Sequence, residues 1–407
     1  MTDRPTGLHQ HRVAATPGSN VVEGRVHYAP VKSLWLMLMV AGGLVGGALT
    51  FSLPAFALFL ASTAVVLLFG HSLGSHRKLI HDSFGCPKWL EYLLVYLGVQ
   101  VGLSGPLGLL RQHELRDYAQ RLPDCHDYLR HGRGFWRDGW WQLHCGLELA
   151  HSPSVRIESV IADDRFYRFL ERSWMLQQLP WAMLFYAWGS WGFVCWGVCA
   201  RVSAGVCGHW LIGYFAHNQG AMHFRVNGAA VQGHNIRLAS LLTMGECWHN
   251  NHHAFPGSAR LGLHAGEWDP GWWALCVLRR CGLAWRLRLP HQLPARPELV
   301  ALAPPLLRPM PQPRPSPLHR PAAEMRLEWP ASVAGAGLLR VLCGAGVDLH
   351  LNPSAPRLML HATHGSVTGV PALLAAVARR NAAARACAQA LLPAARLLER
   401  ARTAATT

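Results

Sequence analysis

The chain has 407 residues, of which 51% are hydrophobic and only 15% are charged, with a formal net charge of +16. Because soluble proteins carry about 25% charged residues, this composition argues against an ordinary soluble protein and favours a membrane protein. The positive charges flank apolar runs without a recognised nucleic-acid-binding motif, so we expect no nucleic acid as a partner. An anionic membrane surface or substrate head group is the expected partner instead. The 11 cysteines form no regular framework and are interpreted as reduced thiols of a cytosol-facing protein.

The N-terminal part of the chain combines a polar segment with a long apolar run. Residues 1–30 are polar and are predicted to form a mobile cytosolic arm. No residue from 33 to 70 is charged, and Pro54 interrupts this run near its middle. A single membrane span needs about 20 residues, so the run predicts two spans joined by a tight turn at the proline.

A second apolar run covers residues 174–216, with Arg201 as its single charged residue. Its length predicts two further spans, with a turn near residues 189–192. Between the two runs, residues 89–110 are apolar but broken by glycines and a proline. We interpret them as a helix at the membrane interface, because a fifth span would put the histidines on opposite faces of the membrane.

The expected fold is therefore an all-α membrane protein with four transmembrane helices, a cytosolic helical cap that holds the histidines, and both termini in the cytosol. The spans are expected near residues 33–52, 54–71, 175–195 and 196–216. This membrane domain covers residues 31–291, and residues 292–324 are a proline-rich linker. Residues 325–407, rich in alanine and arginine, are expected to be disordered or weakly helical.

Residues 245–256 hold the densest histidine motif of the chain. His249, His252 and His253 stand at i, i+3 and i+4, so on a helical turn they share one face and three imidazoles can converge on one point. Neutral imidazole binds iron, zinc and copper, and such a dense cluster is rarely a packing device. A polar helix face with coincidental histidines is the alternative.

Other histidines fall where this topology would gather them. His76 and His81 follow the second span at a spacing that an irregular helix end can bring together. His209 lies two helical turns before His217 on the same face, and an unpaired histidine in a span is costly. The complete set is His76, His81, His113, His126, His209, His217, His249, His252 and His253.

These motifs resemble the histidine boxes of membrane-bound fatty acid desaturases, of the delta-9 acyl-CoA type. Residues 74–84 match the first box. Residues 245–256 match the final box, GEGWHNNHHAFP, almost letter for letter, with Cys247 in place of a glycine. The similarity covers residues 33–291, including the closing segments 269–273 and 282–285.

Two positions depart from the family pattern. In the second box, HRxHH, the last two histidines are replaced by Arg116 and Asp117. In the NxxxH element of the fourth span, Gly213 replaces the asparagine. A carboxylate is a good iron ligand, whereas a guanidinium has no lone pair to offer. The resemblance thus implies these metal ligands, with Asp117 as a substitute: His76, His81, His113, Asp117, His217, His249, His252 and His253.

The resemblance implies a di-iron centre on the cytosolic side. Two non-haem iron ions activate O2 with electrons from a separate donor protein, of the cytochrome b5, ferredoxin or rubredoxin type, and two hydrogens leave adjacent carbons of an acyl chain. The substrate is a fatty acyl-CoA or acyl-lipid. The expected location is a bacterial inner membrane, with the endoplasmic reticulum as the alternative.

Further residues are expected around this centre. Glu246 is a candidate partner that fixes a histidine tautomer. His126 is expected to orient the second box, and His209 is a spare ligand. An anionic head group, such as the phosphates of coenzyme A, is expected to contact basic residues, unless these are ordinary positive-inside charges. The candidates are Arg77, Lys78, Arg111 and Arg116.

Two alternatives remain open at this stage. The altered second box could redirect the oxidant, which would make the chain a hydroxylase or other oxygenase on the same scaffold. Arg116 could instead have disabled the metal site, which would leave a non-catalytic membrane scaffold. Product mass separates the first alternative from desaturation, and iron content separates the second.

Overall fold

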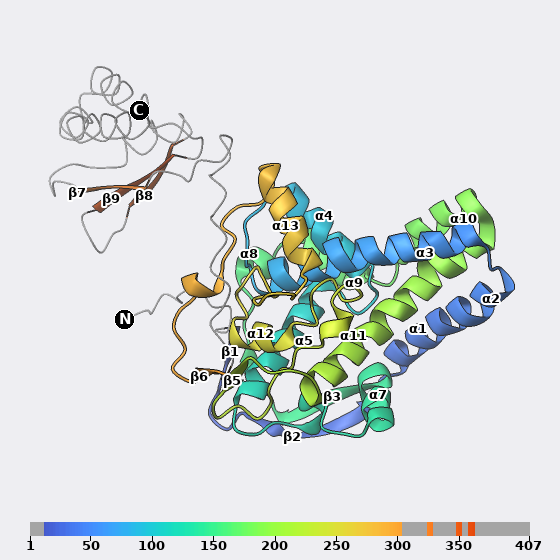
Figure 1. Cartoon of the computed structure of the whole chain (residues 1–407), viewed down its shortest axis with the longest axis horizontal. Coiled ribbons are helices and arrows are strands. Elements are labelled where there is room, and N and C mark those ends of the chain that lie inside the picture. The colour runs from blue at the N-terminus through green and yellow to red at the C-terminus, as the bar shows by residue number, and fades with distance from the viewer. Residues whose placement is uncertain (1–11, 303–323, 329–346, 352–356, 363–407) are drawn as a thin grey trace, which may run out of the picture. The chain divides into compact units, whose positions relative to one another are not determined.

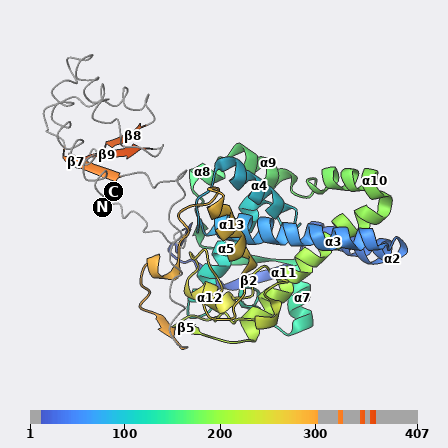
Figure 2. The same ribbon diagram turned by 45° about the horizontal axis from the view of Figure 1, so that its top comes forward.

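The computed structural model describes residues 12–302, 324–328, 347–351 and 357–362. The chain divides into two units, Met1–Pro309 and Met310–Thr407, and each is described by itself. The first unit is mostly helical. Its long helices run together away from a cap of shorter helices and strands (Figures 1 and 2).

Three of the described helices are long and apolar enough to cross a membrane. They are Pro30–Leu49, made of α1 (Pro30–Ala41), η2 (Gly42–Gly46) and α2 (Gly47–Leu49); Leu53–Ile80, made of α3 (Leu53–Val65) and η3 (Val66–Ile80); and Gln178–Asn218, made of α10 (Gln178–Val194), η4 (Cys195–Ala200) and α11 (Arg201–Asn218).

Two local breaks shape these helices. Between the first two, the Ser52 hydroxyl accepts a hydrogen bond from the backbone N–H of Ala55, and Pro54 occupies the first turn of α3, which together start a new helix. The third helix is interrupted at Gly189 (φ −147°, ψ 23°) and Ser190 (φ 59°, ψ −158°). Gln178–Asn218 therefore consists of two helical stretches joined at a bend.

We expected residues 1–30 to form a mobile arm. This prediction is wrong for residues 12–30, the part of the range that the structure describes. Strand β1 (Val13–Ala14) pairs with β4 (Ser154–Val155), and β2 (Asn20–Tyr28) pairs with β3 (Cys145–His151), both antiparallel. Arg12 is buried, and its guanidinium contacts Glu114 and Glu158 at 2.8 Å each. Pairing with residues distant in the sequence orders the segment, and its own composition does not reveal this.

The apolar segment after η3 forms two helices, α4 (Lys88–Val99) and α5 (Pro106–Arg121). Helix α4 lies directly against η3, because Gly70 and Gly74 carry no side chain there. A Cβ at these positions would lie 2.3 Å from the Leu97 carbonyl oxygen and 2.2 Å from the Leu94 carbonyl oxygen. Neither α4 nor α5 is among the membrane-length helices.

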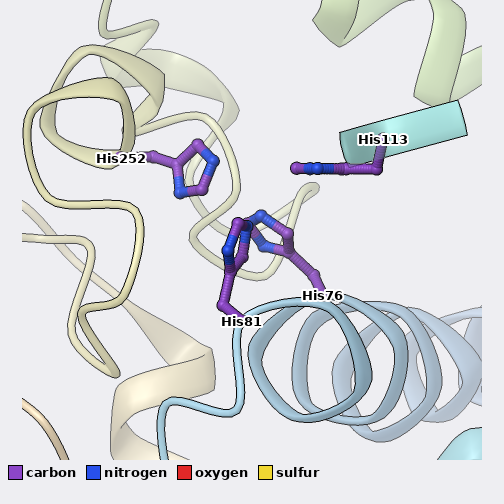
Figure 3. Close-up of side chains that lie close together, drawn as sticks. All are labelled: His76, His81, His113 and His252. Atoms are coloured by element: carbon purple, nitrogen blue, oxygen red, sulfur yellow. The ribbon is translucent and has the colours of Figure 1, made fainter. Parts of the chain in front are cut away.

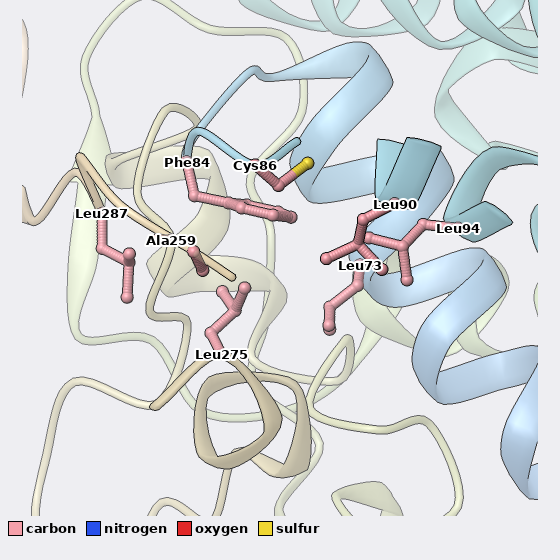
Figure 4. Close-up of a cluster of buried hydrophobic side chains, with 9 residues drawn as sticks. Leu73, Phe84, Cys86, Leu90, Leu94, Ala259, Leu275 and Leu287 are labelled. Atoms are coloured by element: carbon pink, nitrogen blue, oxygen red, sulfur yellow. The ribbon is translucent and has the colours of Figure 1, made fainter. Parts of the chain in front are cut away.

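A buried apolar cluster joins η3 and α4 to the segments that follow the final histidine motif (Figure 4). Leu73 of η3 and Leu94 of α4 meet Leu275 of α13 (Pro270–Arg280) in this cluster. Its members are Leu73, Phe84, Cys86, Leu90, Leu94, Ala259, Leu275, Ala284 and Leu287. The helix that ends in the first histidine box is thereby held against the last part of the first unit.

Short elements complete the first unit. These are α6 (Asp127–Arg130), α7 (Phe135–His144), α8 (Ser159–Ala162), α9 (Arg165–Ser173), β5 (Phe224–Val226), η5 (Arg237–Ala239), α12 (His249–Ala254), η6 (Pro290–Gln292) and β6 (Leu299–Ala301). Strand β6 pairs antiparallel with β5, so part of the expected linker belongs to the first unit. Residues 303–323 of that linker lie outside the described residues.

In the second unit the described residues form one antiparallel sheet with the strand order β7-β9-β8. Its strands are β7 (Glu324–Glu328), β8 (Val347–Leu351) and β9 (Arg357–Ala362). The sheet corrects the prediction of a disordered or weakly helical tail for these residues. The other residues of the tail lie outside the described part of the chain.

Candidate metal centre

The first histidine group gathers four imidazoles from three elements (Figure 3). His76 and His81 come from the end of η3, His113 from α5 and His252 from α12. Their rings face one common space, and one ligand nitrogen from each lies within 4.8 Å of the others. Three ring centroids lie 4.6 to 5.2 Å from that of His76.

The π-helical form of η3 explains why His76 and His81 meet. In an α-helix, residues five apart lie about 140° from each other around the axis. A π-helix joins residues i and i+5 through the backbone, and here the His81 N–H donates to the His76 carbonyl at 3.1 Å. The irregular helix end that the spacing predicts is thus a stretch of π-helix, Val66–Ile80.

The second histidine group consists of His217, His249 and His253. The Nε2 atom of His249 lies 3.1 Å from Nε2 of His217 and 3.1 Å from Nε2 of His253. Two ligand nitrogens bound at about 2.1 Å and at right angles to one metal ion are about 3 Å apart. The spacing therefore matches that of nitrogens arranged around a single cation.

Helix α12 contributes to both groups, which corrects the expectation that its three imidazoles converge on one point. His249 and His253, at i and i+4, belong to the second group, whereas His252 belongs to the first. The ring centroids of His249 and His252 lie 5.6 Å apart. One helical turn thus links two adjoining groups.

The burial and the protonation state of the three α12 histidines fit metal binding. His252 is 1% exposed, and neither of its ring nitrogens has a hydrogen-bond partner among the described residues. Burial and neighbouring imidazoles hold the pKa values of His252 and His253 well below the ordinary value, and burial lowers the pKa of His249 to about 3. These rings are neutral near pH 7, which is the form that binds a metal ion.

The asparagines of α12 fix its orientation on the side away from the histidines, a role that the sequence did not reveal. The Asn250 amide donates to the Phe224 and Gly233 carbonyls, each at 2.8 Å. The Asn251 amide donates to the Leu261 carbonyl at 2.8 Å and to Glu267 at 2.7 Å. The HNNHH pattern could have indicated this division between ligands and anchors.

Glu246 lies beside the first group, as a candidate partner of a histidine should. Its carboxylate is 2.5 Å from Nδ1 of His76, and it accepts a hydrogen bond from the Ser72 hydroxyl at 2.5 Å. This contact leaves Nε2 of His76 as the nitrogen for a metal. Ser72, which sequence reasoning missed, holds the carboxylate in place.

The two altered residues of the second box have different surroundings. Asp117 lies at the four-histidine group, with Oδ2 3.5 Å from Nδ1 of His113 and 4.0 Å from Nε2 of His252. Arg116 contacts neither group through a hydrogen bond that the described residues show. Its guanidinium donates to His131 at 2.6 Å and to Gln142 at 2.9 Å, and burial lowers its pKa.

Two predicted histidines lie outside both groups. His126 caps the start of α6, where its Nδ1 accepts the Tyr128 N–H at 3.1 Å, and its ring stacks on Trp141. That His126 orients the second box stays a prediction, since these contacts join it to Tyr128 and Trp141. His209 meets His71, with ring centroids 5.1 Å apart, and belongs to neither group.

The structure does not favour a head-group site at the predicted basic residues. Arg77 is 1% exposed and donates to Asp269 at 2.7 Å and to the Ala259 carbonyl at 2.8 Å. Lys78 pairs with Asp82, and the Arg116 guanidinium donates to His131 and Gln142 as described above. These contacts show internal roles for the three side chains. Arg111 is exposed.

Membrane-length helices and two adjoining histidine groups define a class, that of membrane proteins with a histidine-built candidate metal centre. No family model matches the chain. It is 35% identical over 266 residues to an sn-1 stearoyl-lipid 9-desaturase of Anabaena variabilis, covering 63% of this chain and 94% of the relative. It is 31% identical over 265 residues to an acyl-CoA 5-desaturase of Anemone leveillei, covering 64% and 81%.

A further relative is a chloroplastic palmitoyl-monogalactosyldiacylglycerol delta-7 desaturase of Arabidopsis thaliana, 32% identical over 240 residues, 58% of this chain and 62% of the relative. The chain belongs to the fatty acyl desaturase family, which confirms the prediction from the histidine boxes. This makes it an oxidoreductase of the class that acts on paired donors with reduction of O2. The relatives do not favour a hydroxylase or a non-catalytic scaffold.

Proposed function

We propose that this chain introduces a double bond into a fatty acyl chain, with two non-haem iron ions held by the two histidine groups. The observation that carries the proposal is the pair of adjoining groups linked through α12, four imidazoles in one and three in the other. When bound, the iron ions supply the O2-dependent oxidising chemistry that an unactivated C–H bond requires. Acid–base groups of the protein alone cannot supply it.

The protein's own residues prepare the site. Burial lowers the pKa of His252 and so keeps this imidazole neutral, and Glu246 fixes the tautomer of His76. Asp117 provides a carboxylate at the position where the family has a histidine, so we propose it as a fifth ligand of the first group. Electrons come from a separate protein of the cytochrome b5, ferredoxin or rubredoxin type.

The substrate is a fatty acyl-CoA or an acyl-lipid, since relatives of both kinds match the chain to a similar extent. The position of the new double bond differs among these relatives, from 5 to 9 in their names. We therefore propose the acyl chain as the shared substrate feature.

We further propose four membrane spans, with both histidine groups on the cytosolic face. His76 and His217 lie near the C-terminal ends of different long helices, yet α12 joins their groups, so both lie on the same side. If Gln178–Asn218 crossed the membrane once, His217 would lie on the face opposite His113. The bend at Gly189 and Ser190 and a length of about 60 Å, twice the hydrocarbon core, support two crossings. A bacterial inner membrane or the endoplasmic reticulum would suit this topology.

Acyl-chain analysis of cells that express the protein tests the proposed reaction. The wild type is expected to yield chains that have lost two hydrogen atoms, and His249→Ala should remove most of this product because it takes a nitrogen from the centre of the second group. His291→Ala, at an exposed position outside both groups, is the matched control and should act as the wild type. Undiminished unsaturation in His249→Ala would refute the mechanism, and chains that gain an oxygen atom would indicate hydroxylation.

A further inference from the structure

The second histidine group has one imidazole fewer than the first, and the residues around it show what could complete it. In the family pattern a histidine and an asparagine occupy the positions of Arg116 and Gly213. His131, which belongs to no histidine motif of the sequence, has its ring at this place. It stacks on the ring of His217, with centroids 5.5 Å apart and an interplanar angle of 17°.

Building on the proposed function, we propose that His131 is the fourth imidazole ligand of the second metal position, oriented by Asp138. The Nδ1 atom of His131 lies 2.9 Å from Oδ2 of Asp138, which is fully buried. A carboxylate at this distance accepts a hydrogen bond from Nδ1–H, so the proton of the neutral ring is on Nδ1 and the lone pair is on Nε2. Metal-binding histidines usually have such a carboxylate or carbonyl partner.

Asp138 is itself tied to the helix that carries His217. Its Oδ2 accepts a hydrogen bond from Nε1 of Trp210 at 2.9 Å, and Trp210 stands on α11. The side-chain amide of Asn218, also on α11, donates to the His131 carbonyl at 3.2 Å. These contacts fix both the ring and the backbone of His131 relative to the second group.

The backbone of His131 adopts a conformation that a histidine rarely takes. Its φ of 55° and ψ of 39° lie in the left-handed region, although the neighbouring Gly132 could adopt that conformation at no steric cost. Strain of this kind in a residue other than glycine clusters at functional sites. It is this conformation that ends α6 and directs the imidazole toward α11.

Gly213 makes room for the ring. A Cβ at residue 213 would lie 3.2 Å from Nε2 and 3.4 Å from Cε1 of His131, so any larger side chain would press on the imidazole. The glycine that stands in place of the family's asparagine is therefore what allows the His131 ring to lie here. The family's ligand position is exchanged for a ligand from a different segment.

Arg116 occupies the lone pair that a metal ion would use. Its Nη1 donates to Nε2 of His131 at 2.6 Å, and the same guanidinium also reaches the Leu129 carbonyl at 3.4 Å and Gln142 at 2.9 Å. A metal ion on Nε2 would displace this donor, and the Leu129 carbonyl and Gln142 would remain as acceptors for the guanidinium. Asp138 adds a negative charge that offsets the buried guanidinium.

Iron binding to the purified full-length protein in detergent tests the assignment. Fe²⁺ is titrated without oxygen, and bound ions per chain and their dissociation constants are measured. His131→Asn removes the imidazole, while asparagine tolerates the left-handed backbone. We expect the wild type to bind two ions, and His131→Asn to bind one as before and the other ~10–100-fold more weakly.

A second pair of variants tests the same assignment by narrowing the space around the His131 ring, without changing the imidazole itself. Gly213→Ala should weaken the binding of one ion. Gly208→Ala, on the same helix with nothing within 4 Å of the added Cβ, is the control and should bind both ions as the wild type does. If His131→Asn binds no ion at all, Gly213→Ala decides the question.

Two ions bound with unchanged affinity in His131→Asn would overturn the assignment and leave the proposed desaturation intact. If His131→Asn fails to fold, an unchanged affinity of Gly213→Ala for both iron ions would overturn the assignment instead. A wild type that forms no unsaturated product would instead contradict the proposed function itself.

Discussion

Asp117 brings a carboxylate next to the first histidine group. A carboxylate in place of an imidazole offers an oxygen ligand, which iron accepts. Its Oδ2 lies close to His113 and His252, at 3.5 and 4.0 Å, and also 3.9 Å from Arg121. These distances support the proposed role of the carboxylate as a ligand at the four-histidine group.

Substitution of Asp117 should separate a ligand from a merely polar neighbour. We expect Asp117→Ala to lower product formation at least ~10-fold, and Asp117→His to retain most of it, because histidine restores a ligand atom at this position. Acyl-chain analysis measures both. Asp124→Ala is the control, since its side chain is 58% exposed and pairs with Arg130. Equal losses in Asp117→Ala and Asp117→His would contradict a ligand role.

The sequence predicts the site's histidines better than their surroundings. All seven histidines of the two groups were expected from the sequence, His113 and His217 through the family resemblance rather than through spacing, and Glu246 is visible beside the final motif. His131 stands in no motif, because its position depends on a left-handed backbone at the end of α6 and on space beside Gly213. Such a contribution arises only from tertiary structure.

Helix α12 is short, and its anchoring rather than its own stability sets the geometry of both groups. Six residues cannot form a stable isolated helix. The buried asparagines compensate through hydrogen bonds to neighbouring loops, and the Asn251 Oδ1 also accepts from the Asn235 amide at 3.0 Å. Loss of an anchor should therefore affect stability and metal binding together.

We expect Asn251→Ala to destabilise the protein by about 1–3 kcal/mol, because it removes the side-chain donor of the Leu261 carbonyl and one of the hydrogen bonds to Glu267. Thermal unfolding in detergent should show a lower melting temperature, with reduced product formation. Asn227→Ala, at an exposed position, should change neither. A wild-type melting temperature in Asn251→Ala would show that the anchor contributes nothing.

The junction between α4 and α9 depends on the ionised form of Glu91. Burial by itself would raise the pKa of Glu91, but hydrogen bonds from Lys88 at 2.7 Å and Tyr167 at 2.5 Å outweigh it and hold the pKa below its ordinary value. A depressed pKa stabilises the folded state above the unfolded value and loses this effect as the pH falls through the folded value.

Glu91→Gln should therefore lower the melting temperature at pH 7, where the carboxylate is fully ionised. The difference from the wild type should shrink as the pH falls below about 4, the ordinary range of a glutamate. Melting curves across this range measure it, and Glu23→Gln at an exposed position should behave as the wild type. A difference that stays constant with pH would rule out the ionised contact.

For the molecule as a whole, uncharged runs and interrupting prolines or glycines were enough to predict where long helices lie, including the break near Gly189. The ordered N-terminal strands could not be predicted, because β2 finds its partner more than a hundred residues away in β3. Local patterns indicate local structure, whereas pairing across the chain requires the tertiary fold.

The number of iron ions bound by the purified wild-type protein tests the account most directly. Two adjoining histidine groups predict two ions per chain after anaerobic reconstitution with Fe²⁺ and removal of free metal. Elemental analysis against protein concentration gives this number. Two ions per chain would agree with the account, and one ion or none would contradict it.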